Sequence, residues 1–260
     1  MLSVTAAQLD LWVASLMFPL ARLLGLIAAA PIFSNRALPM RIRLALGLVI
    51  AMAVVPALPP APALPAGSWL ALTMLAREAF IGIAIGFILR LVFAAVDLAG
   101  ELIGLQMGLS FATFFDPQSG GQTIVLGEFL TLLASLIFLG LDGHLVMIDI
   151  AVKSFDWLPV AANPLGRGGL AFVAHYGITV FAAGFLLALP LIAALLITNI
   201  ALGVLTRAAP QLNLFAVGFP VTLTAGFVVL LLSLNVFGPV MRTLLERGFE
   251  AVDQLLRALA

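Results

Sequence analysis

Residues 168–206 decide the fold: GGLAFVAHYGITVFAAGFLLALPLIAALLITNIALGVLT contains no Asp, Glu, Lys or Arg. A second charge-free run covers residues 208–241. Apolar runs of this kind are typical of helices in a bilayer, where about 20 residues cross the hydrocarbon core. Each run is too long for one crossing and too short for two crossings with a turn. We therefore expect a hairpin of two long helices, kinked at Pro190 and Pro220.

The composition of the whole chain indicates the same class. Hydrophobic residues make up 63%, charged residues 9%, and the mean hydropathy is +1.24, whereas soluble domains are roughly 45–50% apolar and about 25% charged. The sequence therefore predicts an all-α integral membrane protein. Its 12 basic and 12 acidic residues leave no field of one sign to bind nucleic acid.

The sequence offers little for catalysis or metal binding. There is no cysteine, and the two histidines, His144 and His175, are far apart. We find no phosphate-binding glycine loop and no catalytic Ser/His/Asp pattern. We therefore expect neither a metal nor a cofactor, and no enzymatic activity.

Five further helices are expected before the hairpin, at residues 9–30, 44–55, 69–109, 124–141 and 145–157. Linkers rich in proline and glycine follow two of them, at residues 56–67 and, before the hairpin, at residues 159–169. A helix over 69–109 would be about 60 Å long, twice the thickness of the bilayer core. A flat transmembrane bundle is therefore not expected.

The last 19 residues, 242–260, differ in character from the hairpin. Apolar side chains recur in steps of three and four, at Leu245, Phe249, Val252, Leu256 and Leu259. This spacing predicts an amphipathic helix, on which Asp253 and Arg257 can pair. We expect this helix to lie on a surface or on a partner.

The segment GELIGLQMGLSFATFFDPQSGG, residues 100–121, places polar groups and a loop inside an apolar chain. Gly100, Gly104 and Gly108 recur every fourth residue, so on a helix they share one face that another backbone can approach closely. Gly82 and Gly86 form a second pair of this type on the same expected helix. These five glycines are predicted helix-packing positions, either within one chain or between subunits.

An aromatic loop follows these glycines, at about residues 110–121. Its aromatic and adjoining residues are candidates for a channel seal, because apolar side chains close a pore by excluding water: Ser110, Phe111, Phe114, Phe115, Asp116 and Pro117. The phenylalanines alone fit an ordinary core equally well. The polar, glycine-rich tail that follows favours the loop interpretation.

Charged residues inside the apolar segments are costly unless they are paired, so each is a candidate for an inter-subunit contact: Arg22, Arg90, Asp97, Glu101, Glu128 and Arg207. Arg22 and Glu128 are each alone in their segments, and we expect their partners on another helix or chain. Asp97 and Glu101 are like charges four residues apart. Proton transport through them is the alternative to pairing.

Four blocks of the sequence resemble the FliR family of flagellar type III secretion export-gate subunits: APIFSNRALPMRIR at residues 30–43, GELIGLQMGLSFATFFDP at 100–117, FLGLDGH at 138–144 and TRAAPQLNLFAVGFP at 206–220. The resemblance extends from end to end. The related subunit of virulence injectisomes shares the general layout and is the alternative.

The resemblance implies assembly with FliP and FliQ around an export channel, with FlhB and FlhA as further partners and unfolded export substrates as cargo. It implies that residues 1–157 are FliP-like, that residues 168–260 are FliQ-like, and that the loop at 110–121 is the plug of the closed channel. It also implies a place in the bacterial inner membrane, in the flagellar basal body, partly raised towards the periplasm. A self-contained ion-coupled transporter and a scaffold that lines no pore remain the rival interpretations.

Overall fold

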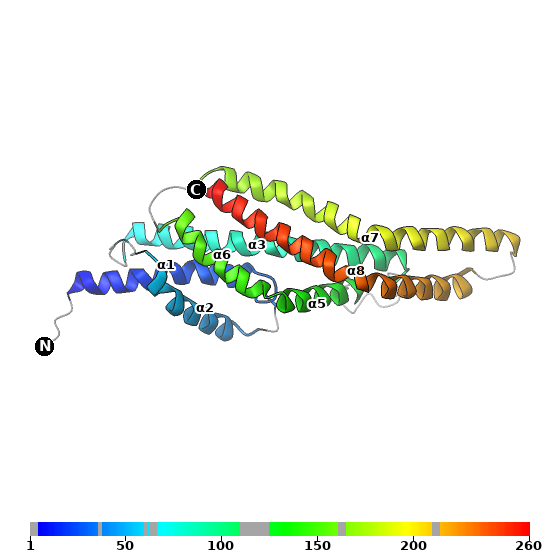
Figure 1. The fold of residues 1–260 in the computed structure, drawn as a ribbon, viewed down its shortest axis with the longest axis horizontal. Coiled ribbons are helices and arrows are strands. Elements are labelled where there is room, and N and C mark those ends of the chain that lie inside the picture. Colours follow the sequence, from blue (N-terminus) through cyan, green and yellow to red (C-terminus); the bar gives the residue numbers. More distant parts are fainter. Residues whose placement is uncertain are drawn as a thin grey trace. The chain divides into compact units, whose positions relative to one another are not determined.

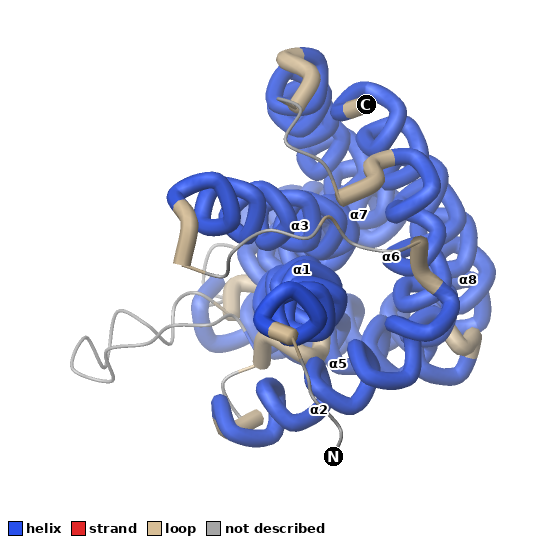
Figure 2. Tube along the Cα trace, turned by 90° about the vertical axis from the view of Figure 1, so that its left-hand side faces the viewer, coloured by secondary structure: helices blue, strands red, loops and turns tan. Residues whose placement is uncertain are grey.

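The computed structural model describes residues 5–35, 38–59, 62, 67–109, 125–160, 165–209 and 214–260. Within these ranges the chain forms helices and no strands (Figures 1 and 2). The predicted all-α fold is thereby confirmed. The candidate plug residues 110–121 lie outside the described ranges.

Seven α-helices and one short 3₁₀ helix make up the described chain: α1 (Ala6–Ala29), α2 (Met40–Val54), η1 (Val55–Ala57), α3 (Trp69–Gln106), α5 (Val125–Gly140), α6 (Gly143–Trp157), α7 (Gly168–Ala208) and α8 (Leu214–Leu259). The helix α1 begins with a capping box, in which the side chains and backbone amides of Thr5 and Gln8 bond reciprocally. Pro190 lies inside α7, which bends along its length in Figure 1. Helices α7 and α8 are the two long helices that the sequence predicts, and their pairing as a hairpin stays a prediction.

Among the described residues, five helices are long and apolar enough to cross a membrane: Asp10–Ala29, Met40–Ala57, Trp69–Gln106, Gly168–Ala208 and Val217–Leu259. A sixth candidate is the pair of α5 and α6, which meet at a bend of 67°. Asp142, in the left-handed conformation with φ 55°, lies at this corner. Helices α7 and α8, with 41 and 46 residues, are about twice as long as one crossing requires.

The chain folds into two compact units that each combine distant segments. Unit 1 comprises Met1–Leu91, Asp142–Tyr176 and Leu245–Ala260, and unit 2 comprises Val92–Leu141 and Gly177–Leu244. Helices α3, α7 and α8 therefore contribute residues to both units. The compact units do not follow the boundary between residues 157 and 168, and the FliP-like and FliQ-like halves stay a prediction.

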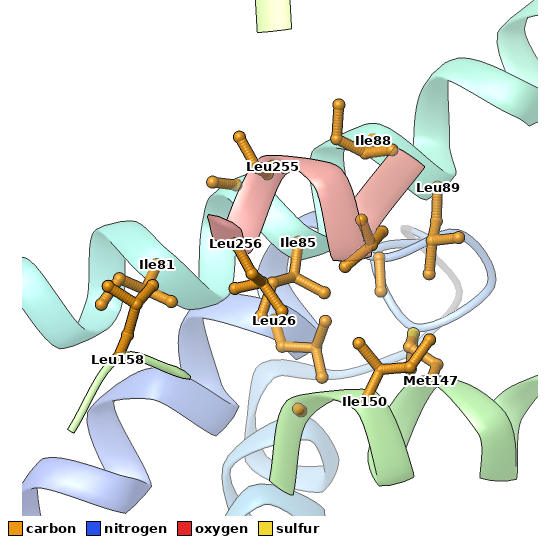
Figure 3. Packing of buried hydrophobic residues seen from close by; sticks show 14 of the residues in the cluster. Leu26, Ile81, Ile85, Ile88, Leu89, Met147, Ile150, Leu158, Leu255 and Leu256 are labelled. Atoms are coloured by element: carbon orange, nitrogen blue, oxygen red, sulfur yellow. The ribbon is translucent and has the colours of Figure 1, made fainter. Parts of the chain in front are cut away.

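The core of unit 1 joins α1, α3, α6 and the last turns of α8. Figure 3 shows Leu256 of α8 close to Leu26 of α1 and Ile85 of α3, with Met147 and Ile150 of α6 nearby. Four apolar residues at the end of α8 are at most 2% exposed, namely Val252, Leu255, Leu256 and Leu259.

The expectation for residues 242–260 needs correction in two respects. These residues are not a separate helix, because α8 runs without a break from Leu214 to Leu259. Its apolar stripe is covered by the core of its own chain. The stripe itself is present in α8, but a sequence does not say what covers an apolar face.

Unit 2 is built around the second part of α3. Phe93 of α3 and Phe138 of α5 are both buried and meet edge to face, with ring centroids 5.8 Å apart. On α7, a Cβ added at Gly184 would lie 2.8 Å from the carbonyl oxygen of Ala95. Helix α3 thus packs closely against both α5 and α7.

Candidate functional site

The described part of the candidate site is the base of the loop that leaves α3 and enters α5. Gly100 of α3 and Gly127 of α5 approach so closely that a Cβ added at Gly100 would overlap the Cα of Gly127 and lie 2.9 Å from the carbonyl oxygen of Leu126. A Cβ added at Gly127 would lie 2.7 Å from Oδ1 of Asp97. Two helices in backbone contact therefore hold the loop at its base.

The helix α3 ends at a glycine cap directly before the loop. The amide of Gly108 donates to the carbonyl of Leu105 at 3.0 Å, and the amide of Leu109 donates to that of Gly104 at 3.0 Å. Gly108 has a φ of 81°. This pattern is a Schellman motif, which terminates helices at a glycine in the left-handed conformation.

Gly108 therefore does not belong to the predicted packing face. The helix ends at Gln106 and not at residue 109, so the shared face includes Gly100 and Gly104, both buried, and stops there. The four-residue spacing continues in the sequence beyond the point where the helix ends. Gly108 sets the direction in which the chain leaves α3.

The end of α3 is also fastened to α8. A Cβ added at Gly226 would lie 2.7 Å from Cγ and Cε of Met107, which is fully buried. The loop base thus has contacts from α3 to both α5 and α8 within unit 2.

Three acidic residues surround the glycine contact. Asp97 and Glu101 of α3 and Glu128 of α5 are exposed, and both Asp97 and Glu101 lie against Gly127. Among the described residues none of the three forms an ion pair. The structure thus adds Glu128 to the pair of like charges seen in the sequence.

Arg22 has its partner within the chain. Its Nε donates to Oε2 of Glu78 at 2.7 Å, its Nη1 to the hydroxyl of Ser154 at 2.8 Å, and its Nη2 to the carbonyl of Leu158 at 2.7 Å. The guanidinium also lies 3.8 Å from the ring centroid of Phe155. Arg22 and Glu78 are both 0% exposed, so this is a buried ion pair between α1 and α3.

The glycine pair Gly82 and Gly86 packs against α1 beside this ion pair. A Cβ at Gly82 would overlap the carbonyl oxygen of Arg22, and a Cβ at Gly86 would lie 2.7 Å from the amide nitrogen of Ala30. Both glycines therefore permit backbone contact within unit 1. Arg90 of α3 and Arg207 of α7 are exposed, and no described residue forms an ion pair with either.

The comparisons with known proteins agree with one another. Residues 13–248 match the family described as bacterial export proteins, family 1. The flagellar biosynthetic protein FliR of Pectobacterium carotovorum is 42% identical over 252 residues, covering 96% of this chain and 95% of the relative. FliR of Escherichia coli K12 is 42% identical over 259 residues, covering 100% and 99%. The chain belongs to the FliR family of bacterial export proteins.

More distant FliR proteins match as well, among them that of Bacillus subtilis, 33% identical over 69% of this chain and 71% of the relative. These relatives are named as flagellar biosynthetic proteins, and the names state no enzymatic activity. The part of the chain that the structure describes contains five helices of membrane-spanning length, so this FliR-family chain is a membrane protein.

Sequence reasoning missed several residues of this FliR-family chain. Gly127 contacts Gly100, and Glu78 binds Arg22, yet neither was a candidate. Gly25 was also missed, although a Cβ there would overlap the carbonyl oxygen of Ala79. A carboxylate within an apolar run was the available signal for Glu78.

We expect Gly108→Ala in this FliR-family chain to lower the free energy of unfolding by about 1 kcal/mol, because alanine is strained at positive φ. Chemical denaturation of the purified chain in detergent measures the change. Gly203→Ala is the control, since nothing lies within 4 Å of a Cβ there and alanine favours a helix. Equal effects of the two changes would contradict the cap assignment.

Proposed function

We propose that this chain is a subunit of the flagellar type III export gate, which builds the export channel with FliP and FliQ and closes it with the loop at residues 110–121. Membership of the FliR family supports the role in flagellar export. The observation that carries the plug assignment is the closed base of the loop, where Gly100 and Gly127 are in backbone contact. A firmly held base lets the loop occupy one place on a shared axis. The chain supplies structure and a seal, and the energy for export comes from elsewhere.

The exposed surface of α7 and α8 supports the assembly with FliP and FliQ homologues. In an apolar stretch of 18 residues within each helix, only 22% is buried in α7 and 17% in α8. The corresponding share in α3 is 61%. Large apolar side chains are exposed along the part of α7 that belongs to unit 2: Ile178, Phe181, Phe185, Leu186, Leu189, Leu196, Ile197, Ile200, Val204 and Leu205. Such helices need lipid or neighbouring helices to cover them. We propose that helices of FliP and FliQ cover these exposed side chains, and that FlhB and FlhA are further partners.

The same proposal sets the cellular location and the cargo. We place the gate in the bacterial inner membrane, within the flagellar basal body and partly raised towards the periplasm, and we take unfolded export substrates as its cargo. Helices of 41 and 46 residues support a raised position, since they exceed one crossing. An injectisome role is the alternative, although the relatives named here are flagellar.

A second function is favoured by one observation only, the three carboxylates of Asp97, Glu101 and Glu128 around Gly127. Acidic groups in an apolar segment can carry protons or cations in a transporter. Purification separates the two functions. If the chain is a self-contained transporter, the purified chain alone should transport ions after reconstitution. If it is a gate subunit, it should copurify with FliP and FliQ in a fixed ratio.

Deleting residues 110–116 tests the plug directly. We expect the assembled gate to let ions or small molecules leak across the membrane, because the seal is removed while the base at Gly100 and Gly127 is kept. The uptake of a small impermeant dye by cells that express the whole gate measures the leak.

Two controls accompany the deletion. The same gate with Gly203→Ala, a change at an exposed position of α7, should remain tight. A stalled export substrate should crosslink to a photoreactive residue at Phe114 or Phe115, whereas a scaffold that lines no pore gives no adduct. A tight membrane after deletion, in a gate that still contains the chain, would refute the plug role.

A further inference from the structure

Unit 1 presents two exposed faces of opposite character. One face, on α6 and the last turns of α8, carries exposed charged side chains: Asp149, Lys153, Asp156, Glu250, Asp253 and Arg257. The other face, on α2, carries large apolar side chains that are 39–66% exposed: Met40, Ile42, Leu44, Leu48, Val49 and Met52. One environment cannot suit both faces.

Some of these charged side chains make contacts along the surface of unit 1. Nζ of Lys153 lies 2.7 Å from Oδ2 of Asp149, and the two side chains are 64% and 55% exposed. The guanidinium of Arg257 lies 4.6 Å from the ring centroid of Trp157, which joins α8 to α6. An exposed ion pair such as that of Lys153 and Asp149 is typical of a surface in contact with water.

The apolar face of α2 has the properties of a lipid contact. The segment Met40–Ala57 has 18 residues and a mean hydropathy of 1.8, and only 11% of it is buried. Its few buried residues, Gly47 and Ala51, are small. Arg41 lies at the beginning of the helix and is exposed, where a cationic group can reach lipid headgroups.

The two faces lie at nearly the same level along α1. Arg22 of α1 donates to the hydroxyl of Ser154 in α6. Lys153, the residue before Ser154, therefore lies near the level of Arg22 along α1. A Cβ at Gly47 would lie 3.3 Å from Cγ of Leu24 and 3.5 Å from Cδ1 of Ile27. These contacts on α1 are separated by about one helical turn, or roughly 5 Å.

We propose that unit 1 stands at a boundary between lipid and water that runs along its helices, with the α2 face in lipid and the α6–α8 face in water at the same depth. Hydrocarbon offers charged side chains no hydrogen-bond partners, so it cannot cover the α6–α8 face. Neither α6 nor the last turns of α8 then faces lipid, although α8 as a whole, and α6 together with α5, are long and apolar enough to cross a membrane. This inference concerns the environment of unit 1 and does not depend on the plug.

Single cysteines test the proposal, because the natural chain contains none. Lys153→Cys and Val49→Cys are a matched pair, at positions that are 64% and 59% exposed and at similar levels along α1. A membrane-impermeant maleimide is applied to spheroplasts and to inside-out vesicles that contain the coexpressed gate, so that both aqueous compartments are reached. Labelling is normalised to that of the same chain after denaturation in SDS.

We expect Lys153→Cys to be labelled at least about tenfold faster than Val49→Cys in one of the two preparations, because a thiolate forms in water and not in lipid. Equal labelling of both positions, or labelling of neither, would overturn the proposal. If Lys153→Cys fails to accumulate, Asp253→Cys and Met52→Cys provide a second pair on the same two faces, and the same outcomes decide.

Discussion

Replacing Glu78 by leucine should lower the free energy of unfolding of the chain by about 3–5 kcal/mol, the usual cost of removing one partner of a buried ion pair. Oε2 of Glu78 lies 2.5 Å from Nη2 of Arg22, and Oε1 accepts from Nη1 of Arg77 at 2.8 Å. The substitution therefore leaves two guanidiniums without their carboxylate, one of them fully buried. Chemical denaturation of the purified chain and its steady-state amount in membranes measure the loss.

Two further variants show whether the loss of stability comes from charged groups that are left without their partner. Arg22→Leu should be milder than Glu78→Leu, because Glu78 keeps its contact with Arg77. The double variant Arg22→Leu/Glu78→Leu should recover part of the loss, since no unpaired carboxylate or Arg22 guanidinium then remains buried. Lys153→Met, which breaks an exposed pair with Asp149, is the control and should leave stability unchanged. Additive losses in the double variant would show that the two residues do not act as a pair.

Gly82→Ala should lower the free energy of unfolding by about 3 kcal/mol, at the upper end of the usual cost of overpacking. A Cβ at this position would overlap the carbonyl oxygen of Arg22 and lie 2.8 Å from the amide nitrogen of Leu26. Both are backbone atoms, so no side chain can rotate away to make room. Helices α1 and α3 would have to separate, which would also lengthen the hydrogen bond between Arg22 and Glu78.

The matched control for this change is Gly177→Ala on α7, where a Cβ would meet nothing within 4 Å. Denaturation of the two purified variants in the same detergent gives the comparison. A loss at Gly177 as large as that at Gly82 would mean that the effect is general to glycine and not due to the contact with α1.

The helices could be predicted from the sequence because apolar runs and their proline and glycine boundaries are local properties. The expected start of α3 at residue 69 and the end of α6 at residue 157 coincide with the structure. The end of α3 was misplaced by three residues, because the capping geometry of Gly108 depends on a backbone angle that the four-residue spacing does not reveal.

For the candidate site, the type of contact could be predicted from the sequence, but the residues that make each contact could not. The rule that an isolated intramembrane charge needs a partner held for Arg22, but its partner Glu78 is 56 residues away and no local pattern links the two. Likewise, the glycines of α3 indicated close packing, yet Gly127 as the counterpart of Gly100 depends on how α3 and α5 meet. Tertiary pairing, and not local propensity, decides such contacts.

The composition of unit 1 has a consequence for synthesis on the ribosome. Its core takes residues from the first 91 positions and again from Leu245–Ala260, and the amide of Gly166 donates to the carbonyl of Leu259. Helices α1 and α3 therefore emerge long before Val252, Leu255 and Leu256, which cover them. Throughout the translation of residues 92–250 this nascent chain has an unfinished core, and an arrest anywhere in that interval leaves a product that cannot complete the unit.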